Sequence, residues 1–269
     1  MDKYDRLQTL IRSLGSAAVA YSGGVDSTLL LKVAYDCLGE KAVGLIAVSP
    51  SLPPYELAEA EEIARHIGAR LERIATREAE DPRYRANPAN RCYFCKTHVY
   101  QELIEYARAR GFAALLDGAN ADDLGDYRPG RQAAREYKVH SPLQELGFHK
   151  EEVRQLAKRL GLPNWDKPAA ACLSSRVPYG TAITPRILSQ IGRAELALRR
   201  LGFRQLRVRH HGEVARLELD PQDFPAALEK REAIVSALRE AGYTFVALDL
   251  AGFRSGSLNT VLSDEVLVQ

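Results

Sequence analysis

The first half of the chain alternates short apolar runs with segments of helical periodicity. Four segments are expected to be strands: the apolar runs 17–21 and 42–48, and further strands at 70–75 and 113–117. Three segments between them have a helical pattern: residues 27–38, a helix opened by Pro53-Pro54 with apolar positions as far as Ile67, and a helix near residues 97–109. Because strands separated by helices need crossover connections, the pattern predicts an α/β fold with a doubly wound parallel sheet.

The second half has a different pattern, which predicts a smaller α+β domain. Its expected elements are a helix at 185–201, a hairpin at 203–219 turning at His211-Gly212, a helix opened by Asp220-Pro221, and a strand at 244–248. Four prolines interrupt regular structure before these elements, at positions 163, 168, 178 and 185. We therefore expect three parts: a first domain of residues 1–165, a linker of residues 166–183 and a C-terminal domain of residues 184–269.

Composition and charge narrow the class of protein. The 37 basic and 35 acidic residues leave a formal charge of +2, so no overall excess points to nucleic acid or to an anionic membrane. No apolar run approaches the ~20 residues that span a bilayer. The first ten residues mix charged and apolar side chains, unlike a signal or transit peptide. We expect a soluble, cytoplasmic protein.

The strongest local motif is Ser22-Gly23-Gly24-Val25-Asp26-Ser27, between a predicted strand and a predicted helix. Adjacent glycines let backbone amides turn toward an anion, and the following helix presents further N–H groups. The motif is not the G-x-x-x-x-G-K-[ST] phosphate loop, because no lysine follows its glycines. It resembles the S-G-G-x-D-S loop of the PP-loop ATP pyrophosphatase family, which cleaves ATP between its α and β phosphates. The resemblance implies that ATP is bound by Ser22, Gly23, Gly24, Asp26 and Ser27.

A second motif, residues 117–123, follows the fourth predicted strand. Ligands bind at the carboxyl ends of strands in α/β sheets, and the carboxylates of Asp122 and Asp123 suit Mg²⁺ beside a triphosphate. An Asx-rich turn with Asp122 as a helix cap is the alternative. The PP-loop family carries a similar G-x-N-x-D-D stretch, and this resemblance implies that Gly118 and Asn120 contribute to ATP binding.

The four cysteines fall into three groups. Cys37 lies in an apolar helical stretch and is expected to be a buried small hydrophobe. Cys92 and Cys95 form a C-x-x-C pair, and Cys172 stands alone, followed closely by hydroxyl residues and an arginine. In a reducing cytosol these three fit metal, cluster or reactive thiols better than a disulfide framework.

Three further segments are similar to the LarE family: residues 90–96, 118–130 and 162–180. LarE proteins are PP-loop sulfurtransferases that act in the synthesis of the nickel-pincer nucleotide cofactor. The resemblance implies that the protein adenylylates a carboxylate of pyridinium-3,5-biscarboxylic acid mononucleotide and replaces an oxygen by sulfur, giving a thiocarboxylate. It also implies a homo-oligomer, with a C-terminal domain for substrate binding and assembly.

The same resemblance offers two sulfur sources. In single-cysteine members the sulfur comes from a cysteine matched here by Cys172, which becomes dehydroalanine. In three-cysteine members, a 4Fe–4S cluster held by Cys92, Cys95 and Cys172 would present a hydrosulfide on its fourth iron. Two alternatives stay open: a zinc site completed by His98, or a metal-free dithiol acting on Cys172.

Arginines near and beyond the linker are candidates for binding the phosphate of the mononucleotide. Arg207 and Arg209 alternate along a predicted strand and therefore share one face, and the guanidinium fork meets two phosphate oxygens. Together with Arg176 they form the predicted phosphate site. The alternative is a solvated sheet face with partners such as Glu218. Glu195 is a weaker candidate, which surface salt pairing also explains.

Three rival functions use the same motifs. A PP-loop tRNA thiolase would also adenylylate and deliver sulfur, although the balanced charge argues against nucleic-acid binding. A nucleotide- and zinc-binding module without turnover would use the cysteines structurally. A PP-loop amide synthetase would use the ATP loop and leave the cysteines without a role.

Overall fold

The computed structural model describes residues 2–125, 130–168, 171–254 and 256–262. The chain forms two compact units, neither contiguous in sequence. The first unit comprises Met1–Ser49, Tyr55–Asp81 and Asn90–Ala170, and the second Pro50–Pro54, Pro82–Ala89 and Ala171–Gln269. Parts of two segments discussed above, residues 126–129 and 169–170, lie outside the described residues.

The first unit is built on a four-stranded parallel sheet in the order β3-β2-β1-β4. Its strands are β1 (Ala17–Ala20), β2 (Ala42–Val48), β3 (Arg70–Ala75) and β4 (Ala114–Leu116). The first three residues of β1 have no exposed surface, which is why this strand is apolar throughout rather than alternating. The predicted α/β fold with a doubly wound parallel sheet is confirmed.

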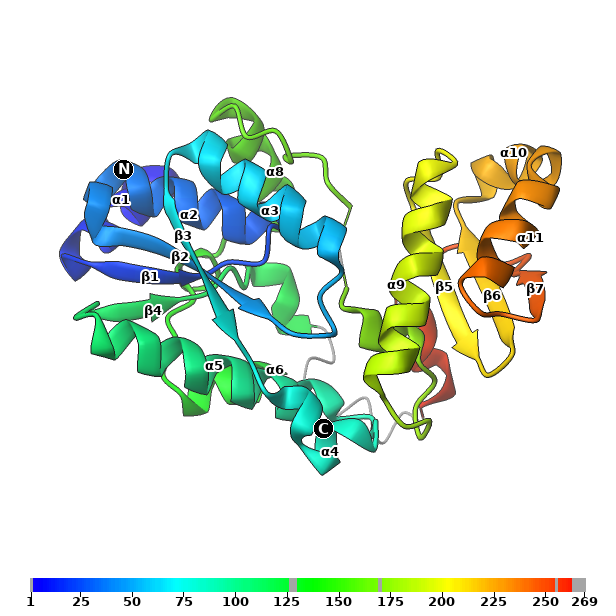
Figure 1. Cartoon of the computed structure of the whole chain (residues 1–269). Coiled ribbons are helices and arrows are strands. Elements are labelled where there is room, and N and C mark those ends of the chain that lie inside the picture. The colour runs from blue at the N-terminus through cyan, green and yellow to red at the C-terminus, as the bar shows by residue number, and fades with distance from the viewer. Residues whose placement is uncertain (1, 126–129, 169–170, 255, 263–269) are drawn as a thin grey trace. The chain divides into compact units, whose positions relative to one another are not determined.

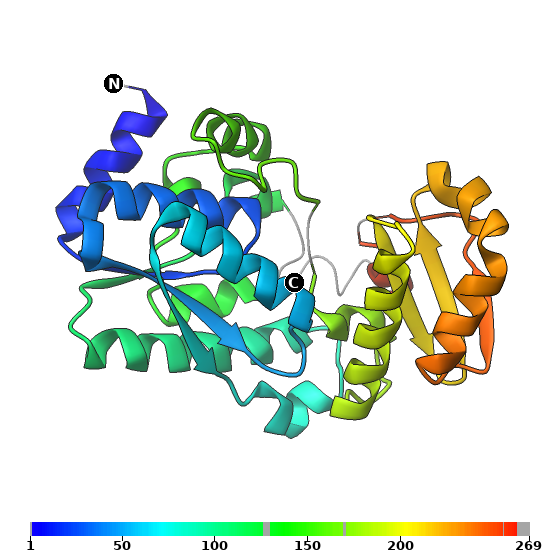
Figure 2. The ribbon, with the colours of Figure 1, turned by 45° about the horizontal axis from the view of Figure 1, so that its top comes forward.

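Helices cover both faces of this sheet. They are α1 (Lys3–Leu14), α2 (Val25–Leu38), α3 (Pro54–Ile67), α5 (Arg91–Ala109), α6 (Gly130–Glu136), α7 (Pro142–Glu145) and α8 (Lys150–Arg159). α2 and α3 run along one face, and α5 runs along the other (Figures 1 and 2). Within the described ranges, no helix combines the length and apolar character needed to cross a membrane.

Three details differ from the sequence-based expectation. α5 begins at Arg91 instead of residue 97, so the C-x-x-C pair is helical. Cys37 is half-buried and was expected to be buried. α8 was not predicted, although its amphipathic pattern buries Val153, Leu156 and Ala157.

The order of the strands creates a switch point between β1 and β4. The chain leaves β1 into α2 on one face, whereas α5 leads into β4 from the other face. The loops at the carboxyl ends of these neighbouring strands therefore meet. A Cβ on Gly118, after β4, would lie 2.8 Å from the backbone nitrogen of Ser27 in α2. Both predicted ATP-binding motifs thus lie at one edge of the sheet.

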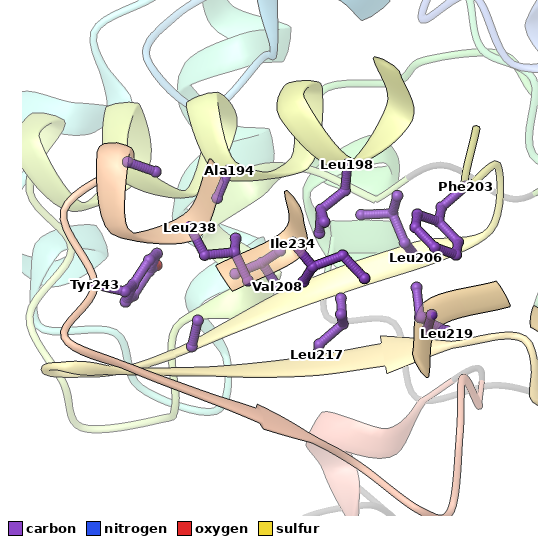
Figure 3. Close-up of a cluster of buried hydrophobic side chains, with 13 residues drawn as sticks. Ala194, Leu198, Phe203, Leu206, Val208, Leu217, Leu219, Ile234, Leu238 and Tyr243 are labelled. Atoms are coloured by element: carbon purple, nitrogen blue, oxygen red, sulfur yellow. The ribbon is translucent and has the colours of Figure 1, made fainter. Parts of the chain in front are cut away.

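The second unit contains a three-stranded sheet in the order β5-β6-β7. β5 (Leu206–His211) and β6 (Val214–Leu219) form the predicted antiparallel hairpin, and β7 (Phe245–Leu248) runs parallel to β6. α9 (Pro185–Arg200) and α11 (Arg231–Glu240) supply buried residues to a core against this sheet. Figure 3 shows this cluster, with Leu206, Val208 and Leu217 of the strands facing Leu198 and Leu238 of the helices.

The proline-rich segment before α9 is irregular, as predicted, but it is firmly held. The buried amide of Asn87 donates hydrogen bonds to the carbonyls of Val177, Pro178 and Thr181. A short 3₁₀ helix, η4 (Leu173–Arg176), interrupts the segment directly after Cys172. Cys172 therefore precedes an ordered turn of the second unit.

Candidate functional site

The Ser22–Ser27 loop closes on itself at the N-terminus of α2. Ser27 Oγ accepts a hydrogen bond from the Ser22 backbone N–H at 3.2 Å and donates to the Gly24 carbonyl at 3.1 Å. Gly23 has φ +71°, and a Cβ there would lie 2.7 Å from the Cβ of Ala60, so only glycine fits. The N–H groups that begin α2 remain available to bind an anion.

The side-chain amide of Asn164, which is distant in sequence, fixes the orientation of this loop. The Asn164 side chain, which is 4% exposed, donates to the Gly23 carbonyl at 3.1 Å and to Thr28 Oγ at 3.0 Å. In a trans peptide the carbonyl and the next N–H point in opposite directions, so the N–H of Gly24 points away from Asn164. Sequence reasoning missed this residue, because nothing in its local pattern indicates a contact with residue 23.

The second motif contacts the first through side chains. Asn120 Nδ2 donates to Asp26 Oδ1 at 3.1 Å, and the Asn120 backbone N–H donates to Asp123 Oδ2 at 3.0 Å. Asp123 is 7% exposed, whereas half of the Asp122 side chain is accessible. The structure therefore brings the predicted ATP-binding residues together, with Asp122 the more accessible of the two predicted magnesium ligands.

The N-terminus of α8 completes this edge of the sheet. Asp122 accepts hydrogen bonds from His149 Nδ1 at 2.6 Å and from the Lys150 backbone N–H at 2.7 Å. Both bonds stabilise the ionised carboxylate and hold the pKa of Asp122 below its usual value. The ammonium of Lys150 contacts Asp26 Oδ2 directly. Lys150 was not among the predicted site residues.

Two of the three thiols proposed for metal binding share one face of α5. Cys92 is exposed and Cys95 half-buried, three residues apart at the start of the helix. His98, the fourth ligand of the zinc alternative, has its Nε2 atom 2.8 Å from Asp81 Oδ2. In the described part of the chain, no three His, Cys, Asp or Glu side chains are grouped as a metal site.

Cys172 combines an anchored backbone with an exposed side chain. Its carbonyl accepts hydrogen bonds from the backbone and hydroxyl of Ser175, at 3.0 and 2.8 Å, and from Arg176 Nη1 at 3.0 Å. The residue as a whole is exposed. All four cysteines lie in the described ranges and none is in a disulfide. The geometry presents the Cys172 thiol on a fixed turn, as a nucleophile or a metal ligand requires.

Arg176 and Glu195 form a buried ion pair in the second unit. Arg176 Nε and Nη2 donate to the two Glu195 oxygens at 2.8 and 2.9 Å, and Glu195 also accepts from the Val208 backbone N–H at 3.0 Å. Burial acts to raise the pKa of Glu195, but the charge and hydrogen bonds of Arg176 outweigh it and keep that pKa below its usual value. Surface pairing of Glu195 is therefore wrong, because its side chain is fully buried.

Arg207 and Arg209 share a face of β5, and that face is buried. Arg209 Nη2 donates to Glu218 Oε2 at 2.8 Å and to Ser257 Oγ at 2.7 Å, while the Arg207 guanidinium lies 4.9 Å from the centroid of the Phe253 ring. The alternative of a solvated sheet face is corrected: residues after β7 cover it. The Glu218 partnership expected in that alternative is present.

An additional arginine lies directly opposite. Arg216 on β6 pairs in register with Arg209, and it donates to Glu218 and to Asp249 Oδ2. The Nε atoms of Arg209 and Arg216 are buried without a hydrogen-bond partner in the described part of the structure. Sequence reasoning missed Arg216: the predicted turn at His211-Gly212 would place residue 214 across from residue 209, whereas the hairpin turns at Gly212-Glu213 and pairs Arg209 with Arg216.

Comparison with known proteins gives near full-length similarity. No family model matches the chain. It is 39% identical over 258 residues to the pyridinium-3,5-bisthiocarboxylic acid mononucleotide synthase of Lactiplantibacillus plantarum, spanning 96% of this chain and 94% of that protein. It is 50% identical over 263 residues to an uncharacterized protein of Synechocystis, 97% and 98% of the two chains. An argininosuccinate synthase of Methanocaldococcus jannaschii is 27% identical over 161 residues, 55% of this chain and 40% of the synthase.

Proposed function

The chain belongs to the LarE family of PP-loop enzymes, and from this membership we propose that it uses ATP to convert a carboxylate of pyridinium-3,5-biscarboxylic acid mononucleotide into a thiocarboxylate. The similarity to the bisthiocarboxylic acid mononucleotide synthase over 96% of the chain carries the proposal. Two local features support it: a glycine loop with the geometry of an anion site, and an exposed cysteine on a fixed turn.

In the first step, a substrate carboxylate oxygen attacks the α-phosphorus of ATP and pyrophosphate leaves. The backbone N–H groups at residues 22–27 would hold the phosphates, with Gly118 and Asn120 completing the nucleotide site. Asp122, whose side chain is half accessible, would assist Mg²⁺, and Asp123 would hold the Asn120 loop beside it. Forming the acyl-adenylate replaces a poor leaving group, the carboxylate oxygen, by a good one, AMP.

In the second step, sulfur replaces AMP at the acyl carbon. With Cys172 as the donor, its thiolate forms a thioester as the C–O bond to AMP breaks. A base then removes the Cα proton of Cys172, and the Cβ–S bond breaks with its electron pair on sulfur. The products are the thiocarboxylate and dehydroalanine at position 172, so each chain acts once.

The other proposed sulfur source is a 4Fe–4S cluster. Such a cluster would need three thiolates, for which we propose Cys92, Cys95 and Cys172: the first two share one helical face, and Cys172 is exposed. Held by these residues, the cluster would supply hydrosulfide sulfur and spare the protein. Changing Cys92 to Ala separates the two sources, because a sacrificial Cys172 keeps its single turnover and a cluster enzyme loses activity.

For the phosphate of the mononucleotide we propose Arg207 and Arg209. Their face carries three arginines with Arg216, against the carboxylates of Glu218 and Asp249. In the described part of the chain, the buried Nε–H groups of Arg209 and Arg216 have no acceptor. A phosphate would supply acceptors for such donors. Arg176, the third predicted phosphate ligand, already donates to Glu195 and to carbonyls beside Cys172, so we propose that it supports phosphate binding by holding that segment.

The activation step can be tested by ATP–pyrophosphate exchange. Exchange that requires the pyridinium biscarboxylate mononucleotide would support the proposal. Exchange that requires tRNA, or none with any carboxylate, would overturn it in favour of a tRNA thiolase or a module without turnover. Anaerobic purification with iron, sulfide and zinc analysis identifies the group bound by the cysteines.

A further inference from the structure

The PP-loop of this chain lacks a lysine of its own, yet a lysine from elsewhere in the fold contacts it. Lys150 lies 124 residues from Asp26, and its ammonium contacts Asp26 Oδ2. Asp26 stands in the first turn of α2, directly after the glycines of the loop. The cation is therefore held where the bound polyphosphate would begin.

The main chain at Lys150 is fixed, while its side chain is adaptable. Its backbone N–H donates to Asp122, and a capping box between His149 and Glu152 fixes the start of α8. A third of the Lys150 side chain is exposed. A lysine ammonium on a flexible stem can exchange one anionic partner for another at little cost.

The negative charge of this edge favours a cation there. Asp26, Asp122 and Asp123 bring three carboxylates to the place where ATP, itself a polyanion, would bind. The backbone nest contributes only partial charges. Without Lys150, Asp26 and the phosphates would repel each other across a short distance.

We propose that Lys150 is a phosphate ligand of ATP in this chain, contacting the pyrophosphate part, and that Asp26 holds its ammonium when the nucleotide is absent. The inference rests on the proposed use of ATP. It assigns to α8 the cation that other phosphate loops carry next to their glycines.

Binding of pyrophosphate, ATP and AMP to the full chain, measured by calorimetry without magnesium, tests this assignment. Lys150→Gln should weaken pyrophosphate and ATP binding by about tenfold or more, as expected for a lost charge-assisted contact, and change AMP binding less than about twofold. Lys150→Arg should restore most of the loss. Lys32→Gln, which breaks an exposed pair with Asp36 on the same helix α2, is the matched control and should leave all three affinities unchanged.

The same measurement in an Asp26→Asn background separates two roles of Lys150: direct contact with the phosphates, and neutralisation of Asp26. With Asp26→Asn present, Lys150→Gln should still weaken pyrophosphate binding. If the double variant bound pyrophosphate as tightly as Asp26→Asn alone, the lysine would only neutralise Asp26, and the inference would be overturned. Equal losses for AMP and ATP would also overturn it. If the wild-type chain bound no ATP, the proposed function itself would fail, whereas normal binding by Lys150→Gln would remove only the role of Lys150.

Discussion

Two ion pairs, one in each unit, show how burial distinguishes an adaptable cation from a fixed one. Lys150 and Asp26 keep 33% and 20% of their side chains exposed, whereas Arg176 and Glu195 keep 3% and 0%. The lysine contacts the carboxylate as a point charge, while the guanidinium makes two parallel bonds and also binds carbonyls beside Cys172. The first pair can open for a ligand, and the second fixes a turn.

This difference predicts that variants of the two units lose different properties. The largest loss is expected for Cys172, which the fixed turn carries. Cys172→Ala should reduce sulfur transfer by about a thousandfold or more, because either sulfur route needs this thiol. Adenylylation should persist, since Cys172 does not belong to the ATP loop. Pyrophosphate release and thiocarboxylate formation, measured in parallel, check this. Full sulfur transfer by the variant would contradict both roles.

Breaking the buried pair should cost more stability than breaking the exposed one. Glu195→Ala should lower the free energy of unfolding by about 3–5 kcal/mol, because it leaves the Arg176 charge buried and unpaired. Lys150→Gln should lower it by less than about 1 kcal/mol, as for an accessible pair. Urea unfolding of both variants checks the contrast. Equal losses would mean that burial does not distinguish the two pairs.

The ATP loop should be sensitive to a single methyl group. Gly23→Ala should destabilise the chain by about 1–3 kcal/mol and weaken ATP binding, since it adds both φ strain and a clash with Ala60. Gly15→Ala is a matched control, because Gly15 has the same φ of +71° and nothing within 4 Å of an added Cβ. If both variants lost equal stability and equal ATP affinity, the clash with Ala60 would not contribute to the loss.

Acid should weaken the fixed pair gradually. The pKa of Glu195 is lowered in the folded protein, so its stabilising contribution is present above the unfolded value of 4.5 and is lost as the pH falls through the lowered pKa. Glu195→Gln should therefore show a shallower loss of stability below about pH 5 than the wild type. Urea midpoints across this range measure the slope. An unchanged slope would contradict the lowered pKa.

Local pattern was enough to predict much of the fold. The segments at 42–48 and 70–75 form β2 and β3 with the predicted bounds, because the signal for each strand lies within one short stretch of sequence. The glycine loop was recognisable for the same reason: its chemistry is contained in six consecutive residues. The hairpin was predicted but its register was not, because the chain turns at Gly212-Glu213, one residue beyond the predicted His211-Gly212.

The residues that complete the site could not be predicted this way. Asn164 contacts Gly23 across 141 residues of sequence, and Lys150 contacts Asp26 across 124. Neither has a local signature, because an ordinary polar residue in a loop and a lysine at a helix start are common. Only the folded positions of α8 and its following loop bring them to the carboxyl edge of the sheet.

In the proposed reaction, ATP activates a carboxylate, which then receives sulfur. Mass analysis of the small-molecule products tests both steps at once, after the protein is incubated with MgATP and pyridinium-3,5-biscarboxylic acid mononucleotide. We expect AMP together with a mononucleotide in which sulfur replaces one carboxylate oxygen. ADP in place of AMP, or AMP with an unchanged mononucleotide under conditions that supply sulfur, would contradict it.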